Sequence, residues 1–178
     1  MGETMHPARR LLTWLSPVDF ALFDHGYLGH GRDYYWHIED CLGSDKGRHE
    51  IVFTHCVEAH CRTRVVGRVW AESWDDVFTD YERWEAAGEP EGYVWGSNWS
   101  MAYPGLTVVD DGDSETAKDW SRRTGRPFHE VLLETDRFAI RLVFHGIRHR
   151  KVSGASGTLA DVIIPIDGSK SFTQPPPP

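Results

Sequence analysis

The sequence lacks any apolar run long enough to cross a bilayer, which takes roughly 20 residues in a helix. Its apolar residues near the N-terminus, 11–15, are too few for a secretory signal. Cysteine is also scarce, because three in 178 residues are an odd number and too few for a disulfide scaffold. These absences predict a cytoplasmic protein with reduced thiols and no membrane partner.

Positive charge is in short supply as well. The chain carries 19 lysines and arginines against 27 aspartates and glutamates, which gives a net charge of −8. A protein that binds a nucleic-acid duplex needs clustered cations to neutralise phosphates, so this balance argues against a nucleic-acid partner. The basic run 148–151 is expected to be the solvated end of a strand. An acidic chain of this kind is better suited to a basic protein partner.

Aromatic residues are abundant, and alternating polarity indicates where strands form. Eight Trp, eight Phe and six Tyr can fill a core at this chain length. Residues 48–66 alternate apolar and polar side chains, which predicts one long half-buried strand with a bulge near Ala59. Residues 128–135 and 138–144 predict a hairpin. Further strands are expected at 34–41 and 159–166.

Two segments change to a helical period. Apolar residues recur three and four apart over 74–87, and Gly88 supplies a stop, so a helix is predicted there. A shorter helix is predicted over 115–124, and one or two helical turns before Asp24. Because strands and helices do not alternate as in βαβ units, we expect an α+β fold with a mainly antiparallel β-sheet and two principal helices. A single α+β domain should cover 1–168, followed by a poorly ordered proline-rich tail over 169–178.

The segment from His55 to Cys61 has the letters of a metal site, since His55-Cys56 is followed by His60-Cys61. Thiolate and imidazole are the ligands that zinc prefers. Cys56 and His60 would share an ion on a helix, but on a strand they lie about 13 Å apart, at about 3.3 Å per residue. A strand would turn Cys61 to the core and Cys56 to the other face with His60. A metal ion would then need ligands from a neighbouring strand, and His37 and Cys41 are the candidates.

A second candidate site is the glycine-rich stretch that follows Asp24 and His25 and contains His30 and Asp33. Carboxylates and imidazoles on such backbone suit a general base, a metal ligand or a phosphate contact. The glycine spacing matches neither the dinucleotide fingerprint nor the P-loop. Histidine and aspartate are also common in ordinary turns, so a structural role stays open. No cofactor is predicted.

A third candidate is a surface that binds a partner. Trp95, Trp99 and Tyr103 recur every four residues, which places them on one face of a strand or a helix. Core packing explains that spacing, but Trp and Tyr also dominate the anchors of binding surfaces. Asp80 and Glu82 belong to the same acidic region, and four acidic side chains of the first helix are expected outside the core: Asp75, Asp80, Glu82 and Glu85.

Several segments resemble the YxiG-like domain proteins, an uncharacterised bacterial family. The resemblance spans most of 24–152 and is carried by aromatic, structural motifs: Asp24-His25-Gly26-Tyr27-Leu28, Phe53-Thr54-His55-Cys56-Val57, Gly92-Tyr93-Val94-Trp95-Gly96, Tyr103-Pro104-Gly105, His129-Glu130-Val131 and Leu142-Val143-Phe144. It implies a small accessory or immunity-type product encoded beside a bacterial toxin. It implies no catalytic residue.

Three functions therefore remain open from the sequence. The absence of a reaction motif, the acidity and the aromatic segments favour a non-catalytic protein-binding protein of the immunity or accessory type. The alternative from another class is a small metal-dependent enzyme that uses His25, His30, His55 or His60. The third is a structural subunit of a larger assembly. The sequence does not predict an oligomeric state.

Overall fold

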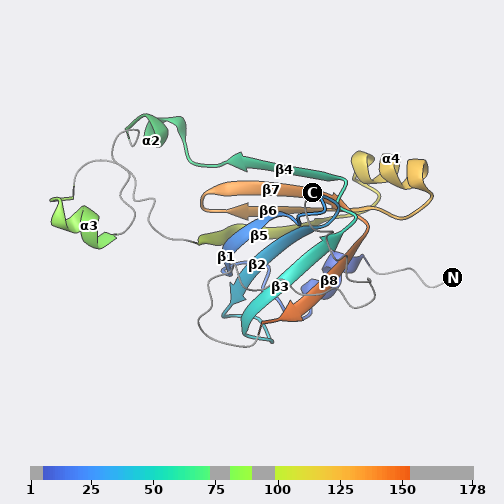
Figure 1. Ribbon diagram of the computed structural model, residues 1–178, viewed down its shortest axis with the longest axis horizontal. Helices are drawn as coiled ribbons and strands as arrows, with labels where there is room; N and C mark the ends of the chain where they lie inside the picture. Colours follow the sequence, from blue (N-terminus) through green and yellow to red (C-terminus); the bar gives the residue numbers. More distant parts are fainter. Residues whose placement is uncertain (1–5, 73–80, 90–98, 153–178) are drawn as a thin grey trace, which may run out of the picture.

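A computed structural model (Figure 1) describes residues 6–72, 81–89 and 99–152 of the chain. Its strands form one antiparallel set in the order β4-β7-β6-β5-β1-β2-β3-β8. The strands are β1 Ala21–Tyr27, β2 Tyr34–Asp40, β3 Gly47–Thr54, β4 Glu58–Thr63, β5 Ser100–Val109, β6 His129–Thr135, β7 Phe138–Phe144 and β8 Gly146–Lys151. The helices are α1 Pro7–Leu11, α2 Gly67–Glu72, α3 Tyr81–Ala86 and α4 Glu115–Thr124. The predicted α+β class with a mainly antiparallel sheet is confirmed.

The predicted single strand over 48–66 is wrong, because the chain bends at residues 55–57. β3 pairs with β8 as far as Thr54 opposite Gly146, and β4 pairs with β7 from Glu58 opposite Val143. The backbone of His55 takes a φ of 49°, in the left-handed region that few residues other than glycine adopt. The expected bulge near Ala59 is thus a sharp bend four residues earlier, at His55. There the chain passes from β3 in one half of the sheet to β4 in the other, and the neighbouring β7 and β8 are divided between the two halves in the same way.

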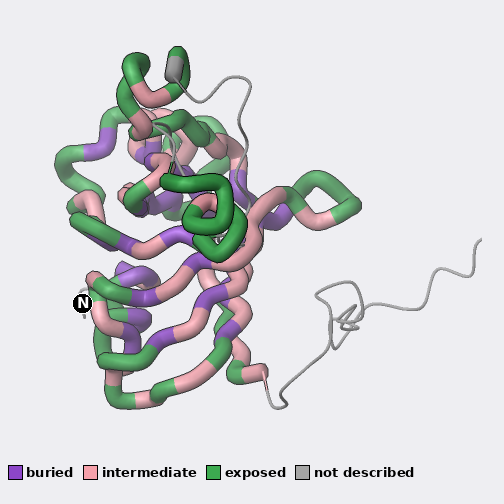
Figure 2. Tube along the Cα trace, turned by 90° about the vertical axis from the view of Figure 1, so that its left-hand side faces the viewer, coloured by how far each residue is buried: buried purple, intermediate pink, exposed green. Residues whose placement is uncertain are grey.

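The bend folds the sheet over a single main core. The hairpin predicted over 128–135 and 138–144 forms as β6 and β7. On β7 Ile140, Leu142 and Phe144 are fully buried, and Phe138 packs beside them. Trp36 on β2 and other buried side chains of the first strands cover that face from the opposite side. Buried and less buried residues alternate along the strands in Figure 2, as the period-two pattern requires.

The N-terminal segment agrees with the prediction only in part. One or two helical turns are expected before Asp24, and α1 supplies one, but it ends at Leu11 and β1 begins at Ala21. Buried Leu15 and Phe20 hold the intervening chain on the core, and the amide of Leu106 donates to the carbonyl of Pro17. Tertiary packing therefore overrides the local helix signal.

The first half of the predicted helix over 74–87 lies outside the described residues, and the second half contains α3. Glu82 and Glu85 are exposed, as predicted. Tyr81 is exposed too, although it belongs to the apolar side of the predicted helix, and no residue of α3 is buried. The sequence did not indicate α2. The strand predicted over 159–166 and the tail over 169–178 also lie outside the described residues. No described helix is both long and apolar enough to cross a membrane.

The predicted helix over 115–124 is confirmed as α4, and its first turn has a clear cap. Ser114 is buried, and its hydroxyl accepts a hydrogen bond from the amide of Ala117 at 3.0 Å while it donates to the carboxylate of Glu130. Replacing Ser114 with alanine removes the cap and leaves Glu130 with one partner fewer. We expect a loss of about 1 kcal/mol in the free energy of unfolding.

Urea unfolding of the purified S114A variant measures this loss. Replacing Thr124, whose exposed hydroxyl lies at the other end of α4, with alanine provides the control. Equal losses in the two variants would contradict a specific role for the cap.

Candidate functional site

A pocket of about 640 Å³ opens at the bend, where the turn between β1 and β2, the bend itself and the end of α4 meet. We call it the bend pocket. Five basic or imidazole side chains line it, and so do aromatic and apolar ones: His30, Arg32, His55, Arg126 and His145, with Tyr27, Cys56, Val57, Trp120 and Phe128. None of the described residues that line it carries a carboxylate. The pocket is therefore positively charged although the chain is acidic.

Asp33 does not line the pocket but binds two residues that do, Arg32 and His55. Its carboxylate is fully buried and accepts two hydrogen bonds from the Arg32 guanidinium, both at 2.9 Å. It also accepts the backbone N–H of His55 at 2.9 Å. Burial alone would raise the pKa of Asp33, but these hydrogen bonds and the charge of Arg32 hold it below its usual range. The carboxylate thus fixes both Arg32 and the left-handed backbone of His55.

The side chains of the bend differ in their protonation. Burial lowers the pKa of His55, and the neighbouring Arg32 charge lowers it further, so its ring is neutral near pH 7. Burial raises the pKa of Cys56 to about 12, so its thiol is protonated and is a poor nucleophile. His145 places its Nδ1 2.6 Å from the carbonyl of Pro127, which points the other ring nitrogen away from that carbonyl. These groups suit binding of an anion better than nucleophilic chemistry.

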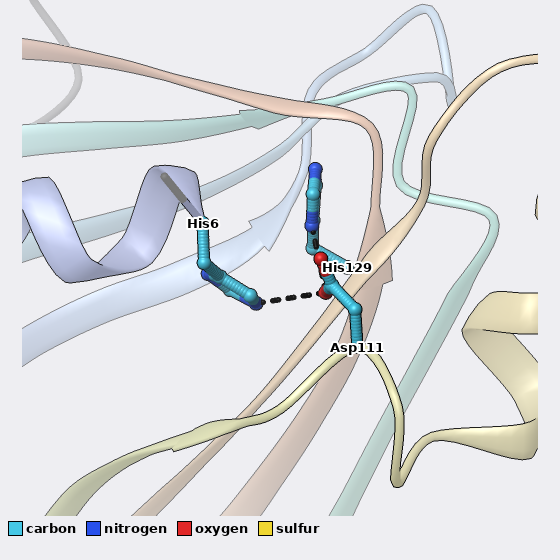
Figure 3. Close-up of side chains that lie close together, drawn as sticks. All are labelled: His6, Asp111 and His129. Carbon is cyan, nitrogen blue, oxygen red and sulfur yellow. Dashed lines mark hydrogen bonds and ion pairs between the residues drawn. The ribbon is translucent and has the colours of Figure 1, made fainter. Parts of the chain in front are cut away.

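A second cluster of side chains joins three segments that are distant in the sequence (Figure 3). His6 precedes α1, Asp111 follows β5, and His129 begins β6. The Asp111 carboxylate lies 2.9 Å from His129 Nδ1 and 3.5 Å from His6 Nε2, and both rings are turned towards it. Both imidazoles are almost completely buried, whereas half of the aspartate is exposed.

The ligand atoms of this cluster lie within 4.8 Å of one another, close enough to consider a metal ion. The proton positions argue against one. His6 Nδ1 accepts the backbone N–H of Ala8 at 3.1 Å, so in the neutral ring Nε2 must carry the proton. To bind a metal ion through Nε2, the His6 ring needs a lone pair on Nε2 and a proton on Nδ1. That Nδ1–H would point at the Ala8 N–H, so two donors would face each other. The Asp111 carboxylate therefore accepts the Nδ1–H of His129, whereas the Nε2–H of His6 faces it at 3.5 Å and has no hydrogen-bond partner among the described residues.

A third group contains Asp45, His49 and His149. His49 Nδ1 and His149 Nε2 form a hydrogen bond of 2.8 Å, and the other nitrogen of His49 lies 2.7 Å from the carbonyl of Asp45. The Asp45 carboxylate is paired with the ammonium of Lys151. A metal ion would have to displace that ammonium and break the bond between the imidazoles, so these contacts are typical of a structural network.

Comparison with known proteins places the chain in a family. The model of the YxiG-like protein family matches residues 6–159, which is most of the sequence. The protein belongs to the YxiG-like family. Among the solved structures, a crystal structure of an uncharacterised protein from Neisseria gonorrhoeae is similar over 76% of this chain and 93% of that one, at 7% identity and a TM-score of 0.36. No curated protein matches the chain.

The residues predicted for a site in this YxiG-like protein divide between two places. His30, Asp33, His55 and Cys56, which came from two separate motifs, meet at the bend pocket. Asp24 and His25 do not reach it, because they bind Tyr35 and Tyr34, respectively, on β2. His60 lies on β4 and is exposed. Of the four histidines of the metal-enzyme alternative, only His30 and His55 therefore come together.

The metal ligands considered for the Cys56–His60 segment also fail to meet. His37 lies on β2 beside Glu50 at 3.0 Å, and β4 neighbours only β7 in the sheet order. Cys41 is exposed at the end of β2. Cys56 is buried and Cys61 exposed, which reverses the predicted facing because the bend shifts the alternation. No sequence pattern indicates Arg32, Arg126 or Trp120, because their place in the pocket depends on the tertiary fold.

Of the residues predicted to bind a partner, those that the structure describes lie at the other end of this YxiG-like molecule, where α2 and α3 stand away from the sheet (Figure 1). Trp99 is 37% and Tyr103 67% exposed, so neither belongs to the core. Glu82 is exposed on α3. Trp95 and Asp80 lie outside the described residues. We call residues 64–72, 81–89 and 99–103 the aromatic arm.

Proposed function

We propose that the protein is a non-catalytic protein-binding protein of the immunity or accessory type, and that the aromatic arm is its binding surface. The observation that supports this is where the exposed apolar side chains lie. Of the eight large apolar residues that are exposed within the described chain, five belong to the arm: Val66, Trp70, Tyr81, Trp99 and Tyr103. Clustered exposed aromatics are typical of interaction surfaces.

Charge indicates the kind of partner. The sequence from 64 to 103 contains three arginines and eight acidic residues, so it carries 3 − 8 = −5 of the net charge of −8. Aromatic anchors on an acidic segment complement a basic protein surface, and this charge also speeds the encounter of the two proteins. The proposed partner is therefore a basic protein, and in the immunity-type case a toxin.

Affinity capture tests the arm. The tagged wild-type chain should retain a basic protein from a lysate of the native host, and the triple variant Tyr81→Ser, Trp99→Ser and Tyr103→Ser should not. With the purified partner, we expect the triple substitution to raise Kd by about 10⁴-fold, because three aromatic hot spots contribute about 2 kcal/mol or more each and a factor of ten in Kd takes about 1.4 kcal/mol. Leu42→Ser is the matched control, since Leu42 is 60% exposed and does not belong to the arm.

Three outcomes bear on the proposal. A partner that binds the triple variant as tightly as the wild type, or a wild type that retains no protein, contradicts it. Retention of a second copy of the chain alone, seen as a stable oligomer by light scattering, supports the structural subunit instead. For the immunity-type function, the captured partner should inhibit growth when expressed alone, and co-expression of the wild-type chain should restore growth.

A further inference from the structure

We propose that the bend pocket binds a small phosphorylated ligand that carries a planar ring, of the size of a nucleoside monophosphate. The proposal is independent of the aromatic arm, which lies at the other end of the molecule (Figure 1). It depends on three features of the pocket: its charge, the rigidity of the groups that supply the charge, and the aromatic wall beside them.

The charge of the pocket exceeds what its surroundings neutralise. The carboxylate of Asp33 lies beside it, and its single charge faces Arg32 at 2.9 Å, His30 at 3.8 Å and Arg148 at 4.0 Å. The carboxylate of Glu58, which binds the Trp120 indole, is paired with Arg141 at 3.7 Å. Arg126 lines the pocket from the end of α4, and no described carboxylate forms an ion pair with it. A dianionic phosphate would supply the missing negative charge, and guanidinium groups bind its oxygens through paired hydrogen bonds.

The donors are held in place before any ligand arrives. Asp33 binds two nitrogens of Arg32 at once, which fixes the plane of the guanidinium. The same carboxylate holds the amide of His55, and the carbonyl of Arg32 accepts the amide of Cys56 at 2.8 Å. Left-handed backbone at a residue other than glycine costs of order 1 kcal/mol and is frequent where a side chain is set for binding. Groups that are already ordered lose little entropy when they bind.

The wall of the pocket suits a flat ring. Trp120 and Phe128 line it together, with ring centroids 6.1 Å apart, and Tyr27 and Val57 add apolar surface. The Trp120 indole is held by two contacts, a hydrogen bond of 2.9 Å to Glu58 and the Arg123 guanidinium over its ring. A volume of about 640 Å³ lies in the range of small-molecule sites and leaves room for a ring beside the phosphate.

Calorimetric titration of the full chain tests the proposal with three probes: AMP, inorganic phosphate and adenosine. We expect AMP to bind most tightly, because it alone offers both parts of the ligand. Arg126→Gln should raise the Kd for AMP about 10-fold, the effect of one lost charge-assisted hydrogen bond. Arg10→Gln removes an equal charge from the exposed end of α1 and should leave the Kd unchanged. Trp120→Leu should weaken AMP and leave inorganic phosphate unaffected.

Several outcomes overturn the proposal. They are no heat of binding with millimolar AMP and a folded wild type, equal affinities for AMP and adenosine, or equal losses in the Arg126→Gln and Arg10→Gln variants. Circular dichroism confirms that each variant is folded, and both arginines are exposed, so neither substitution disturbs the core. Partner capture by the aromatic arm should be unchanged in Arg126→Gln, so failure of one proposal does not decide the other.

Discussion

Replacing Asp33 with asparagine should lower the free energy of unfolding at pH 7 by about 3 kcal/mol, because it breaks a buried charge pair from one side. An asparagine oxygen still accepts the amide of His55, but its nitrogen presents N–H to the N–H groups of Arg32. The fully buried site offers that amide nitrogen no water. The loss lies near the lower end for buried pairs, since Arg32 is half exposed and can turn to solvent.

Urea unfolding of the wild type and D33N at pH 7 measures the difference. Glu39→Gln is the control, because its carboxylate forms an exposed ion pair with Arg48 at 3.4 Å, and such pairs contribute under about 1 kcal/mol. The D33N variant should also lose affinity for AMP if the bend pocket binds it, because Arg32 and His55 lose their common support. A loss of less than 1 kcal/mol would mean that the bend does not depend on Asp33.

The strands that could be predicted are those whose neighbours in space are also neighbours in sequence. The hairpin of β6 and β7 needs only a short turn, so alternation and two turn residues at 136–137 sufficed. The bend at 55–57 could not be predicted, because the alternation of 48–66 continues through it with little change. At the bend the amide of His55 donates to the buried carboxylate of Asp33, which lies 22 residues earlier in the sequence, so no local pattern indicates this contact.

The candidate sites show the same limit. Histidine and aspartate in a glycine-rich turn, and the histidine and cysteine of the bend, were recognised as unusual, and the fold brings them to one pocket. The metal interpretation failed because chelation depends on the register between strands, and β2 and β4 are not neighbours. The His6–Asp111–His129 cluster was out of reach, since its members are separated by 105 and 18 residues in the sequence and no local pattern joins them.

The His6–Asp111–His129 cluster should make the protein less stable in mild acid. Burial, followed by the nearby His129, lowers the pKa of His6 from 6.5 to about 4, although Asp111 acts in the opposite direction. A proton must go to Nδ1, which already accepts the Ala8 N–H at the start of α1, so protonation also breaks that cap. Between pH 6.5 and pH 4 the unfolded chain therefore binds a proton that the folded chain refuses, and stability falls with pH.

For His6 alone this linkage amounts to about 2 kcal/mol of lost stability between pH 7 and pH 5. His6→Asn removes the titrating group and keeps an acceptor at the cap. Urea unfolding at both pH values should therefore show a loss that is about 2 kcal/mol smaller in H6N than in the wild type. Burial also lowers the pKa values of His25 and His149, so a part of the acid sensitivity should remain in the variant.

The matched control is His60→Asn, because His60 is two-thirds exposed on β4 and folding changes its surroundings far less. It should lose as much stability between pH 7 and pH 5 as the wild type does. If H6N also loses as much stability as the wild type, unfolding does not cause proton uptake at His6. That result would exclude a neutral His6 imidazole in the folded protein. If the loss of stability is smaller in H6N than in the wild type but equal in H60N and the wild type, the acid sensitivity belongs to the His6 ring, which caps α1 and faces Asp111.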